Sequence, residues 1–278
     1  MSGTVIYEGD SYKNFYPFTI NHATFEIRVG LGTLLDSFTH NNKIILVVRD
    51  SLKDIMEERY PDAIVNPDKI PDGCNEIYLD EELDNNDKMI IYGQDVGGGK
   101  GGVFTATRGL TQKYGKDRVF NSPLAESSII GTAIGMATLG YHPVVEIQFG
   151  DYIWYGMMQI RNEVATMRYR SNGKWSCSMV IRVPVGGYIH GSLCHSQCIE
   201  SYFAHLPGIY IAYPSNAEDA KGLLKMACRM NDPVLFLEHK GLYRQGFAAS
   251  PEPDNKYLLP FGKGRMVNDG QDLTIITW

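Results

Sequence analysis

Two residues of this sequence carry side chains suited to acid–base chemistry and stand where the chain changes from strand-like to loop-like. Glu126 follows the short stretch RVF (118–120), and His195 lies in the Gly- and His-rich loop GGYIHGSLCHSQC (186–198). A carboxyl group and an imidazole can each exchange a proton near neutral pH. The simpler alternatives are an acid that favours the positive end of a helix dipole and a loop histidine bonded to a carbonyl.

Two other patterns suggest chemistry but lack what it needs. Cys194, His195 and Cys198 could hold a metal ion, but no second ligand pair of recognisable spacing accompanies them. We therefore expect no metal site in this chain. GGGKGG (97–102) resembles a phosphate loop without the Ser or Thr that should follow Gly-Lys. A flexible loop is the better interpretation.

Strands and helices alternate from about residue 88, which predicts an α/β fold with a doubly wound parallel sheet. The expected strands are MIIYG (89–93), RVF (118–120), PVVEIQF (143–149), MVIRVP (179–184), GIYIAY (208–213) and PVLFLEH (233–239). The expected helices run from Ser122-Pro123 to Leu139, with Gly140 as the stop, over 157–170, and from a capping box of Ser215 and Glu218 to about Met230. Ligands of such a sheet bind beyond the carboxyl ends of its strands. The loop Gly93–Gly102, Glu126 and His195 all follow strands in this way.

The first eighty residues have a different composition. TVIY (4–7) and IILVV (44–48) predict strands, SLKDIMEERY (51–60) predicts a short helix, and a polar run precedes Lys88. At the other end, LTIITW (273–278) predicts a strand with nothing after it. We expect three parts: 1–81, an N-terminal α/β segment of uncertain role; 82–250, the main domain; and 251–278, a linker with the first strand of a truncated C-terminal domain.

Composition limits the classes of partner. The net charge of −6 argues against nucleic acid or an anionic membrane surface, and no stretch approaches the ~20 apolar residues of a membrane span. Five cysteines, odd in number and irregularly spaced, favour reduced thiols in a cytoplasmic protein.

The second part of the chain resembles a known family. GQDV, GGVFTATRGL, RVFNSPLAESSIIGTAIGMA, PVVEIQFGDYI, QIRNEVATMRYRS, HGSLCHSQ, HLPGIYIAYPSNAEDAKGLL, DPVLFLEHKGLYR and DLTIITW are similar, in the same order, to the beta subunits of pyruvate and branched-chain 2-oxo acid dehydrogenases. The resemblance covers about residues 82–278. It implies a transketolase-like pyrimidine-binding domain that shares thiamine diphosphate with a partner chain.

The resemblance also implies roles for four residues. Glu126 would hydrogen-bond the aminopyrimidine ring and exchange a proton with its nitrogen, and His195 would donate or accept a proton near the reacting carbon and the lipoyl group. Gln148 and Tyr152 would lie beside the pyrimidine, although packing in the core or at its rim is the alternative for both. His190 could help to orient the loop. The chain departs from the family at Tyr155-Gly156, where Pro-Ala is usual, and at Cys198, where Ser is usual.

The diphosphate and Mg²⁺ must be held by another chain, because no Gly-Asp-Gly followed by Asn occurs here. This disfavours transketolase and deoxyxylulose-phosphate synthase, which carry both halves on one chain. The implied partners are an alpha subunit, a lipoyl-bearing acyltransferase and a second beta half, in a heterotetramer. The implied enzyme decarboxylates a branched-chain 2-oxo acid with acylation of a lipoyl group. Pyruvate is the second choice, and a fused or truncated remnant without turnover is the alternative of another class.

Residues 4–83 show a weaker resemblance. YPFTINHATFEIRVGLGTLLDSF is similar to the start of sugar-phosphate nucleotidyltransferase-like proteins, but the usual Thr-Arg-Pro is absent, and no Gly-rich nucleotide signature follows. A structural cap or a fusion remnant is the expected role.

Overall fold

The computed structural model describes residues 79–189, 191–243, 248–266 and 268–276, together with five strands nearer the N-terminus. The chain divides into two compact units, Met1–Cys74 and Asn75–Trp278. In the first unit, a parallel sheet has the order β1-β4-β5 and a hairpin joins β2 to β3. These strands are β1 Gly3–Tyr7, β2 Arg28–Val29, β3 Gly32–Thr33, β4 Lys43–Val47 and β5 Ile64–Val65. The strands expected over 4–7 and 44–48 are confirmed; the helix expected over 51–60 lies outside the described residues.

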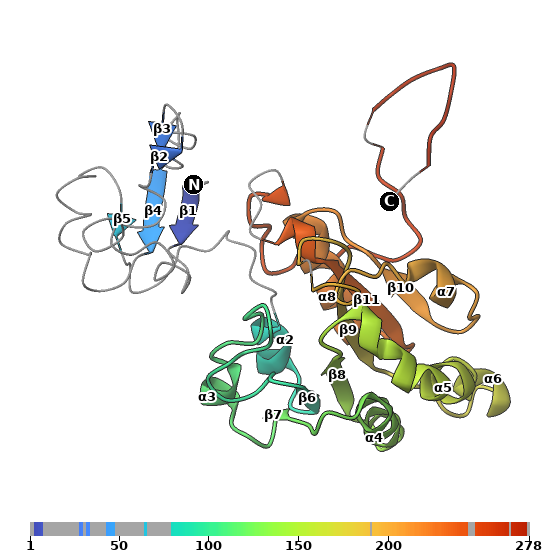
Figure 1. Ribbon diagram of the computed structural model, residues 1–278. Coiled ribbons are helices and arrows are strands. Elements are labelled where there is room, and N and C mark those ends of the chain that lie inside the picture. Colours follow the sequence, from blue (N-terminus) through green and yellow to red (C-terminus); the bar gives the residue numbers. More distant parts are fainter. Residues whose placement is uncertain are drawn as a thin grey trace. The chain divides into compact units, whose positions relative to one another are not determined.

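The second unit is built on a six-stranded sheet in which every pairing is parallel. Its order is β10-β11-β9-β8-β6-β7 (Figure 1). The strands are β6 Met89–Gly93, β7 Val119–Asn121, β8 His142–Glu146, β9 Val180–Val185, β10 Tyr210–Ala212 and β11 Val234–His239. All six strands expected from the sequence are confirmed within a few residues at their ends. Their apolar runs reflect a sheet that is covered on both faces.

Helices cover both faces of this sheet (Figure 1). On one face the core includes Tyr92, Val145, Ile181 and Leu235, packed against α4 and the segments from η5 to α7. On the other, the neighbouring positions of the same strands pack against α2, α3 and α8. The helices are α2 Asp80–Asn85, α3 Leu110–Tyr114, α4 Glu126–Thr138, α5 Met157–Gln159, α6 Met167–Arg170, α7 Glu200–Ala204 and α8 Ala217–Arg229, with short turns at η5 Gly150–Gly156, η6 Ile160–Val164 and η7 Lys240–Leu242. No helix among the described residues is long and apolar enough to cross a membrane.

The helix expected over 157–170 is not continuous. A π-helical turn, η6, separates α5 from α6. The hydroxyl of Thr166 donates to the carbonyl of Asn162 one turn earlier, a contact that bends helices. Gly208 also packs on this segment so closely that a Cβ there would lie 1.9 Å from the carbonyl oxygen of Ala165.

The helix ends differ from expectation in two places. α4 begins at Glu126, and Ser122 does not cap it, since its hydroxyl donates to the carbonyl of Pro123 at 3.1 Å. The end is as expected: Gly140 adopts φ +82° in a Schellman-type turn. α8 is capped by Asn216, whose side chain accepts from the amide of Asp219 at 2.9 Å, so the expected capping box was wrong by one residue.

The strand expected over 273–278 does not form in its described part, 273–276. The side chains of Leu273 and Ile276 are 76% and 92% exposed, and Figure 1 shows the segment as a loop outside the sheet. A strand needs a neighbour for its hydrogen bonds, and β propensity alone does not supply one. The assignment of 251–278 to the start of a further domain stays a prediction.

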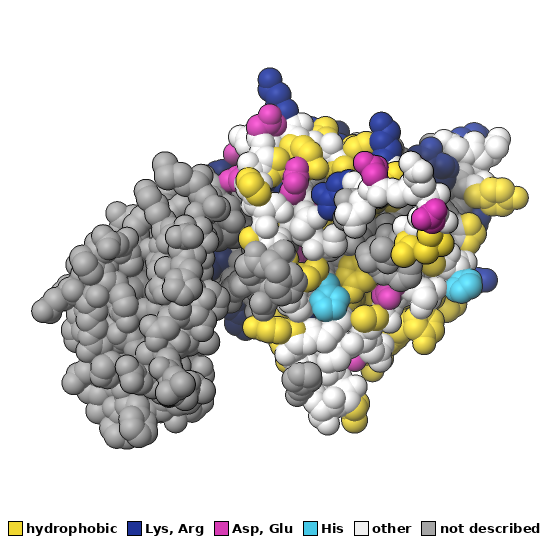
Figure 2. Space-filling view, turned by 90° about the horizontal axis from the view of Figure 1, so that it is seen from above, with side chains coloured by type: hydrophobic (Ala, Val, Ile, Leu, Met, Phe, Trp, Pro, Cys, Tyr) yellow, Lys and Arg dark blue, Asp and Glu magenta, His cyan; other side chains and the backbone are white. Residues whose placement is uncertain are grey.

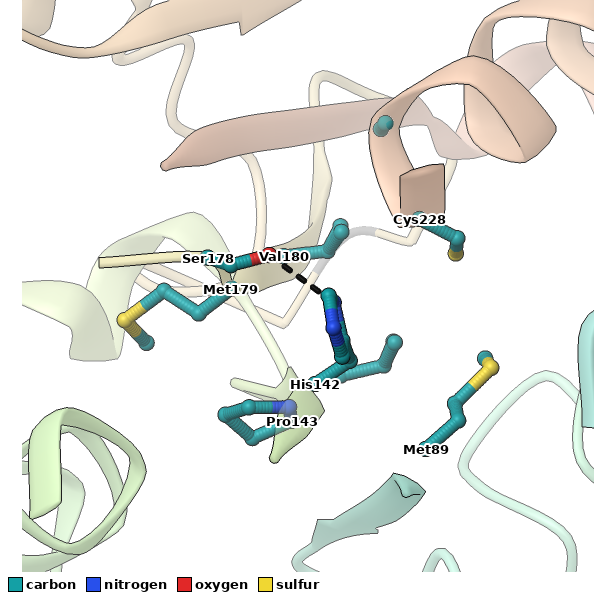
Figure 3. Close-up of a pocket in the computed structure, with 9 residues that line it drawn as sticks. Met89, His142, Pro143, Ser178, Met179, Val180 and Cys228 are labelled. Atoms are coloured by element: carbon teal, nitrogen blue, oxygen red, sulfur yellow. Dashed lines mark hydrogen bonds between the residues drawn. The ribbon is translucent and has the colours of Figure 1, made fainter. Parts of the chain in front are cut away.

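A small pocket lies at the amino ends of the strands. Met89, His142 and Ser178 line it with the end of α8, and the hydroxyl of Ser178 lies 2.9 Å from Nδ1 of His142 (Figure 3). The pocket has no room for a water molecule. This pocket is therefore too small to bind a ligand.

The sheet encloses a buried ionic cluster on its α2/α8 face. Arg182 in β9 is 1% exposed and lies between Glu146 of β8 and Glu238 of β11. Its guanidinium donates to Glu146 at 2.8 Å and to both oxygens of Glu238 at 2.7 and 2.9 Å. Burial raises the pKa of Glu146 to about 7 in spite of the attraction of Arg182.

Replacing Arg182 by Met should leave two buried carboxylates without their cation. Breaking a buried pair in this way costs about 3–5 kcal/mol, so the free energy of unfolding in urea should fall by that amount. Arg168→Met, which removes an exposed ion pair with Asp232, is the control and should cost about 1 kcal/mol or less. Equal losses in the two variants would contradict a dominant role for the buried cluster.

Candidate active site

The turn after β6 forms the first wall of the candidate site. Gly93 ends the strand, and a Cβ there would lie 2.4 Å from the carbonyl oxygen of Glu146, so only glycine fits. The next two residues carry side chains toward other loops. Asp95, with φ 60°, accepts from Gln148 at 3.2 Å and pairs with Lys100 at 2.7 Å. Gln148 lies in the loop after β8, and its amide ties this loop to the loop after β6.

Glu126 is the first residue of α4 and is only 8% exposed. Its Oε1 accepts from Nε2 of Gln94 at 3.2 Å. Gln94 is itself 4% exposed, and its Oε1 is buried without a hydrogen-bond partner among the described residues. The carboxyl group therefore lies in a partly dehydrated place and is held by a neutral amide rather than by a cation.

Tyr152 and His195 form the second pair of the site. The hydroxyl of Tyr152, in η5, lies 2.8 Å from Nε2 of His195, in the loop after β9. The ring of Phe149 contacts both edge-on, with centroid distances of 5.7 Å to Tyr152 and 4.4 Å to His195. Nδ1 of His195 is buried and has no hydrogen-bond partner among the described residues. The two residues therefore form a hydrogen-bonded pair, and the second ring nitrogen of His195 has no partner among the described residues.

Electrostatics links the two pairs. The pKa of Tyr152 is raised by burial first, and then by the charges of Cys194, Asp151 and Glu126. Of the four predicted site residues, the structure brings Tyr152 and His195 into direct contact. Gln94 and Asp95 connect Glu126 with Gln148.

The sequence did not single out several residues that shape the site. Gln94 and Asp95 stand in the GQDV block, but nothing in their types assigned them contacts. Lys240, directly after β11, is fully buried, and its Nζ lies 5.5 Å from the centre of the Phe149 ring. Burial lowers the pKa of Lys240 to about 8. A lysine after a strand gives no sequence signal of this kind, because charged loop residues are usually solvated.

The departures at 155 and 156 lie beside Glu126. The side chain of Tyr155 is exposed, and its carbonyl accepts from the hydroxyl of Ser127. A Cβ at Gly156 would lie 3.1 Å from Ile130 and 3.4 Å from the carbonyl oxygen of Glu126, so an alanine there would be tight. The glycine therefore lets η5 pack closely on the first turn of α4. His190 lies outside the described residues.

Residues of η5, of the loop after β9 and of α7 line a shallow hollow of about 430 Å³. Trp154, Gln197, Cys198 and Tyr202 line it, and the indole of Trp154 donates to Gln197 at 3.0 Å. Cys198 is a free, exposed thiol. Among the described residues, no group of three His, Cys, Asp or Glu side chains is placed to hold a metal ion.

Residues 74–245, more than half of the chain, match the family model described as "Transketolase, pyrimidine binding domain". The chain belongs to this family. The fold class expected from the sequence, a parallel α/β sheet of the transketolase-like pyrimidine-binding type, is thereby confirmed.

Relatives of this pyrimidine-binding domain are beta subunits of 2-oxo acid dehydrogenases. The "2-oxoisovalerate dehydrogenase subunit beta" of Bacillus subtilis (strain 168) is 48% identical over 200 residues, which are 72% of this chain and 60% of the relative. The mitochondrial protein of that name from Dictyostelium discoideum is 48% identical, over 72% of this chain and 53% of its own. The "Pyruvate dehydrogenase E1 component subunit beta" of Bacillus subtilis is 44% identical, over 72% and 61%.

The chain thus spans between about half and two thirds of these relatives. Among solved structures, a "Split gene transketolase, inactive beta4 tetramer" aligns with a TM-score of 0.44 and 22% identity, over 56% of this chain and 46% of that one. The resemblance expected for residues 82–278 is confirmed by the relatives. The resemblance of residues 4–83 to nucleotidyltransferase-like proteins stays a prediction.

Proposed function

We propose that this chain is the beta-subunit half of a thiamine-diphosphate-dependent 2-oxo acid dehydrogenase that decarboxylates a branched-chain 2-oxo acid and acylates a lipoyl group. The observation that carries the proposal is the hydrogen-bonded Tyr152–His195 couple next to the buried Glu126. Identity of 48% to 2-oxoisovalerate dehydrogenase beta subunits, against 44% to a pyruvate dehydrogenase beta subunit, favours the branched-chain substrate. Pyruvate remains the second choice.

The residues present fit a pyrimidine ring. An aminopyrimidine has donors and acceptors along one edge, and the site offers a buried carboxyl group and the free Oε1 of Gln94. Unpaired buried polar atoms cost about 1–3 kcal/mol each, which a polar ligand can offset. When bound, thiamine diphosphate supplies the thiazolium carbon that attacks the 2-oxo group.

The chain's own residues then have separate tasks. Glu126 exchanges a proton with the pyrimidine nitrogen, and His195 gives or takes a proton close to the reacting carbon and the lipoyl sulfur. Tyr152 holds the imidazole of His195 through its hydroxyl and lies beside the pyrimidine ring. Gln148 also lies beside the pyrimidine and anchors the loop after β6 through Asp95. The ring of Phe149 contacts His195 and helps to exclude water from this couple.

Other chains complete the proposed site. An alpha subunit binds the diphosphate and Mg²⁺, since this sequence lacks the motif for them. A second beta half completes the heterotetramer. A lipoyl-bearing acyltransferase supplies the lipoyl group that accepts the acyl product. Acidic, basic and hydrophobic side chains are interspersed on the face drawn in Figure 2, which suits protein partners better than nucleic acid or a membrane surface. We place the assembly in the cytoplasm.

The isolated chain should bind thiamine diphosphate with Mg²⁺ weakly or not at all. Isothermal titration should show no saturable binding below roughly millimolar, a free energy of about −4 kcal/mol. Adding a cognate alpha subunit should restore binding and 2-oxo acid decarboxylation. Micromolar binding by the chain alone would contradict the shared site, and binding without turnover in the mixture would favour a non-catalytic remnant.

His195→Ala should leave assembly and cofactor binding intact but slow reductive acylation by about 10²–10⁴-fold, the usual scale for a positioned acid–base group. His205→Ala, at an exposed histidine after α7, is the control and should keep the wild-type rate. Stopped-flow assays with a lipoyl domain measure both. A wild-type rate in His195→Ala would contradict the acid–base role and leave His195 with a structural role in its loop.

Glu126→Gln keeps the shape of the side chain but cannot exchange a proton with the ring. In the assembled enzyme it should slow hydrogen–deuterium exchange at the thiazolium carbon by at least about 10²-fold while some cofactor stays bound. Glu218→Gln, in the first turn of α8, is the matched control for a helix-start acid and should have no effect. Equal exchange rates in wild type and Glu126→Gln would exclude the proposed role.

A further inference from the structure

Gln94 touches the carboxyl group of Glu126 with only half of its amide. Nε2 donates to Oε1 of Glu126 at 3.2 Å, and Oε1 of Gln94 has no hydrogen-bond partner among the described residues. Both side chains are more than nine-tenths buried. A buried acceptor without a partner is unfavourable, and a second state of the molecule in which it is hydrogen-bonded is one reason for a protein to keep it.

A carboxyl group that changes its protonation state needs a neighbour with two roles. The ionised form only accepts hydrogen bonds, whereas the protonated form also donates one. Lysine and arginine only donate and would favour the ionised form. A primary amide can do both, because a 180° rotation about its terminal torsion, which is broad and two-fold, exchanges its NH₂ and its oxygen.

We propose that Gln94 is a positioning residue that serves both protonation states of Glu126, donating through Nε2 to the carboxylate and, after rotation of its amide, accepting through Oε1 from the protonated carboxyl group. The inference rests on the proposed function, because proton exchange at Glu126 is the step that it supports.

The surroundings restrict this change to the side chain. A Cβ at Gly93 would lie 2.4 Å from the carbonyl oxygen of Glu146, so the residue before Gln94 leaves no room for a side chain against β8. On the other side, Asp95 is held by Gln148 and Lys100. The lysine charge is therefore paired with Asp95 and leaves the amide as the partner of Glu126. The charge of Glu126 also contributes, after burial, Cys194 and Asp151, to the raised pKa of Tyr152 in η5.

The test compares Gln94→Met, which removes both roles, with Gln94→Lys, which keeps only the donor. In the assembled enzyme at saturating cofactor, both should slow exchange at the thiazolium carbon by about 10-fold, equivalent to ~1.4 kcal/mol. Gln94→Glu should recover part of the rate at mildly acidic pH, because a protonated carboxyl group both donates and accepts. Gln112→Met, at an exposed glutamine of α3, is the control and should exchange at the wild-type rate.

If Gln94 only anchors the carboxylate, Gln94→Lys will exchange as fast as wild type, and the proposal is overturned. A loss confined to cofactor affinity, with normal exchange once bound, also overturns it.

An infrared measurement without cofactor separates this inference from the proposed function. The carboxylic acid band of Glu126, assigned by its loss in Glu126→Gln, should appear on acidification of wild type. It should be absent from Gln94→Lys at the same pH, since the added ammonium favours the carboxylate. An identical band in both proteins would contradict the contact, whereas normal exchange in Glu126→Gln would contradict only the cofactor chemistry.

Discussion

The buried Arg182 cluster is the constraint on which the rest of the structure depends. Three neighbouring and largely apolar strands each contribute one charged residue to the interior, and these meet at 2.7–2.9 Å. Two ionised carboxylates and one guanidinium carry a net negative charge. Burial raises the pKa of Glu146 to about 7, which reduces this charge near neutral pH. A pairing of this kind tolerates no slip in register, because one residue of slip would turn a charge into the opposite hydrophobic layer.

The same cluster fixes the loops above it. Glu146 lies so close to the loop after β6 that a Cβ at Gly102 would be 3.0 Å from its carboxylate. Glu238 accepts from the hydroxyl of Tyr243, whose ring packs on Phe104 at 4.9 Å. Phe104 in turn contacts Phe149, the ring that lies against His195. The aromatic wall of the site is therefore continuous with the ionic core of the sheet.

The sequence predicted the sheet well because β6, β8, β9 and β11 are short apolar runs bounded by turn residues, a local signal. It also placed the loops that carry Glu126 and His195 at the carboxyl edge of the sheet, since that follows from parallel connectivity. The sequence did not predict which side chains pair with each other within the site. Gln94 and Glu126 are 32 residues apart, and Tyr152 and His195 are 43 apart, so only the folded sheet selects them. The predictions of a continuous helix through Thr166 and of a strand at 273–276 failed for a related reason. Tertiary contacts, which the local sequence does not show, decide both.

His195 shows what this rigidity permits. Its φ of 75° lies in the left-handed region, which costs a residue other than glycine about 1–2 kcal/mol. Gly191 leaves the space that its ring needs, since a Cβ there would lie 2.1 Å from Nδ1. Gln197 secures the loop on the far side, accepting from the amide of Gly186 at 3.0 Å and donating to Asp151 at 3.3 Å. Strain of this size persists only where the surroundings determine the backbone, as they do here. The backbone of its loop therefore holds the imidazole in place without a ligand, as the proposed acid–base role of His195 requires.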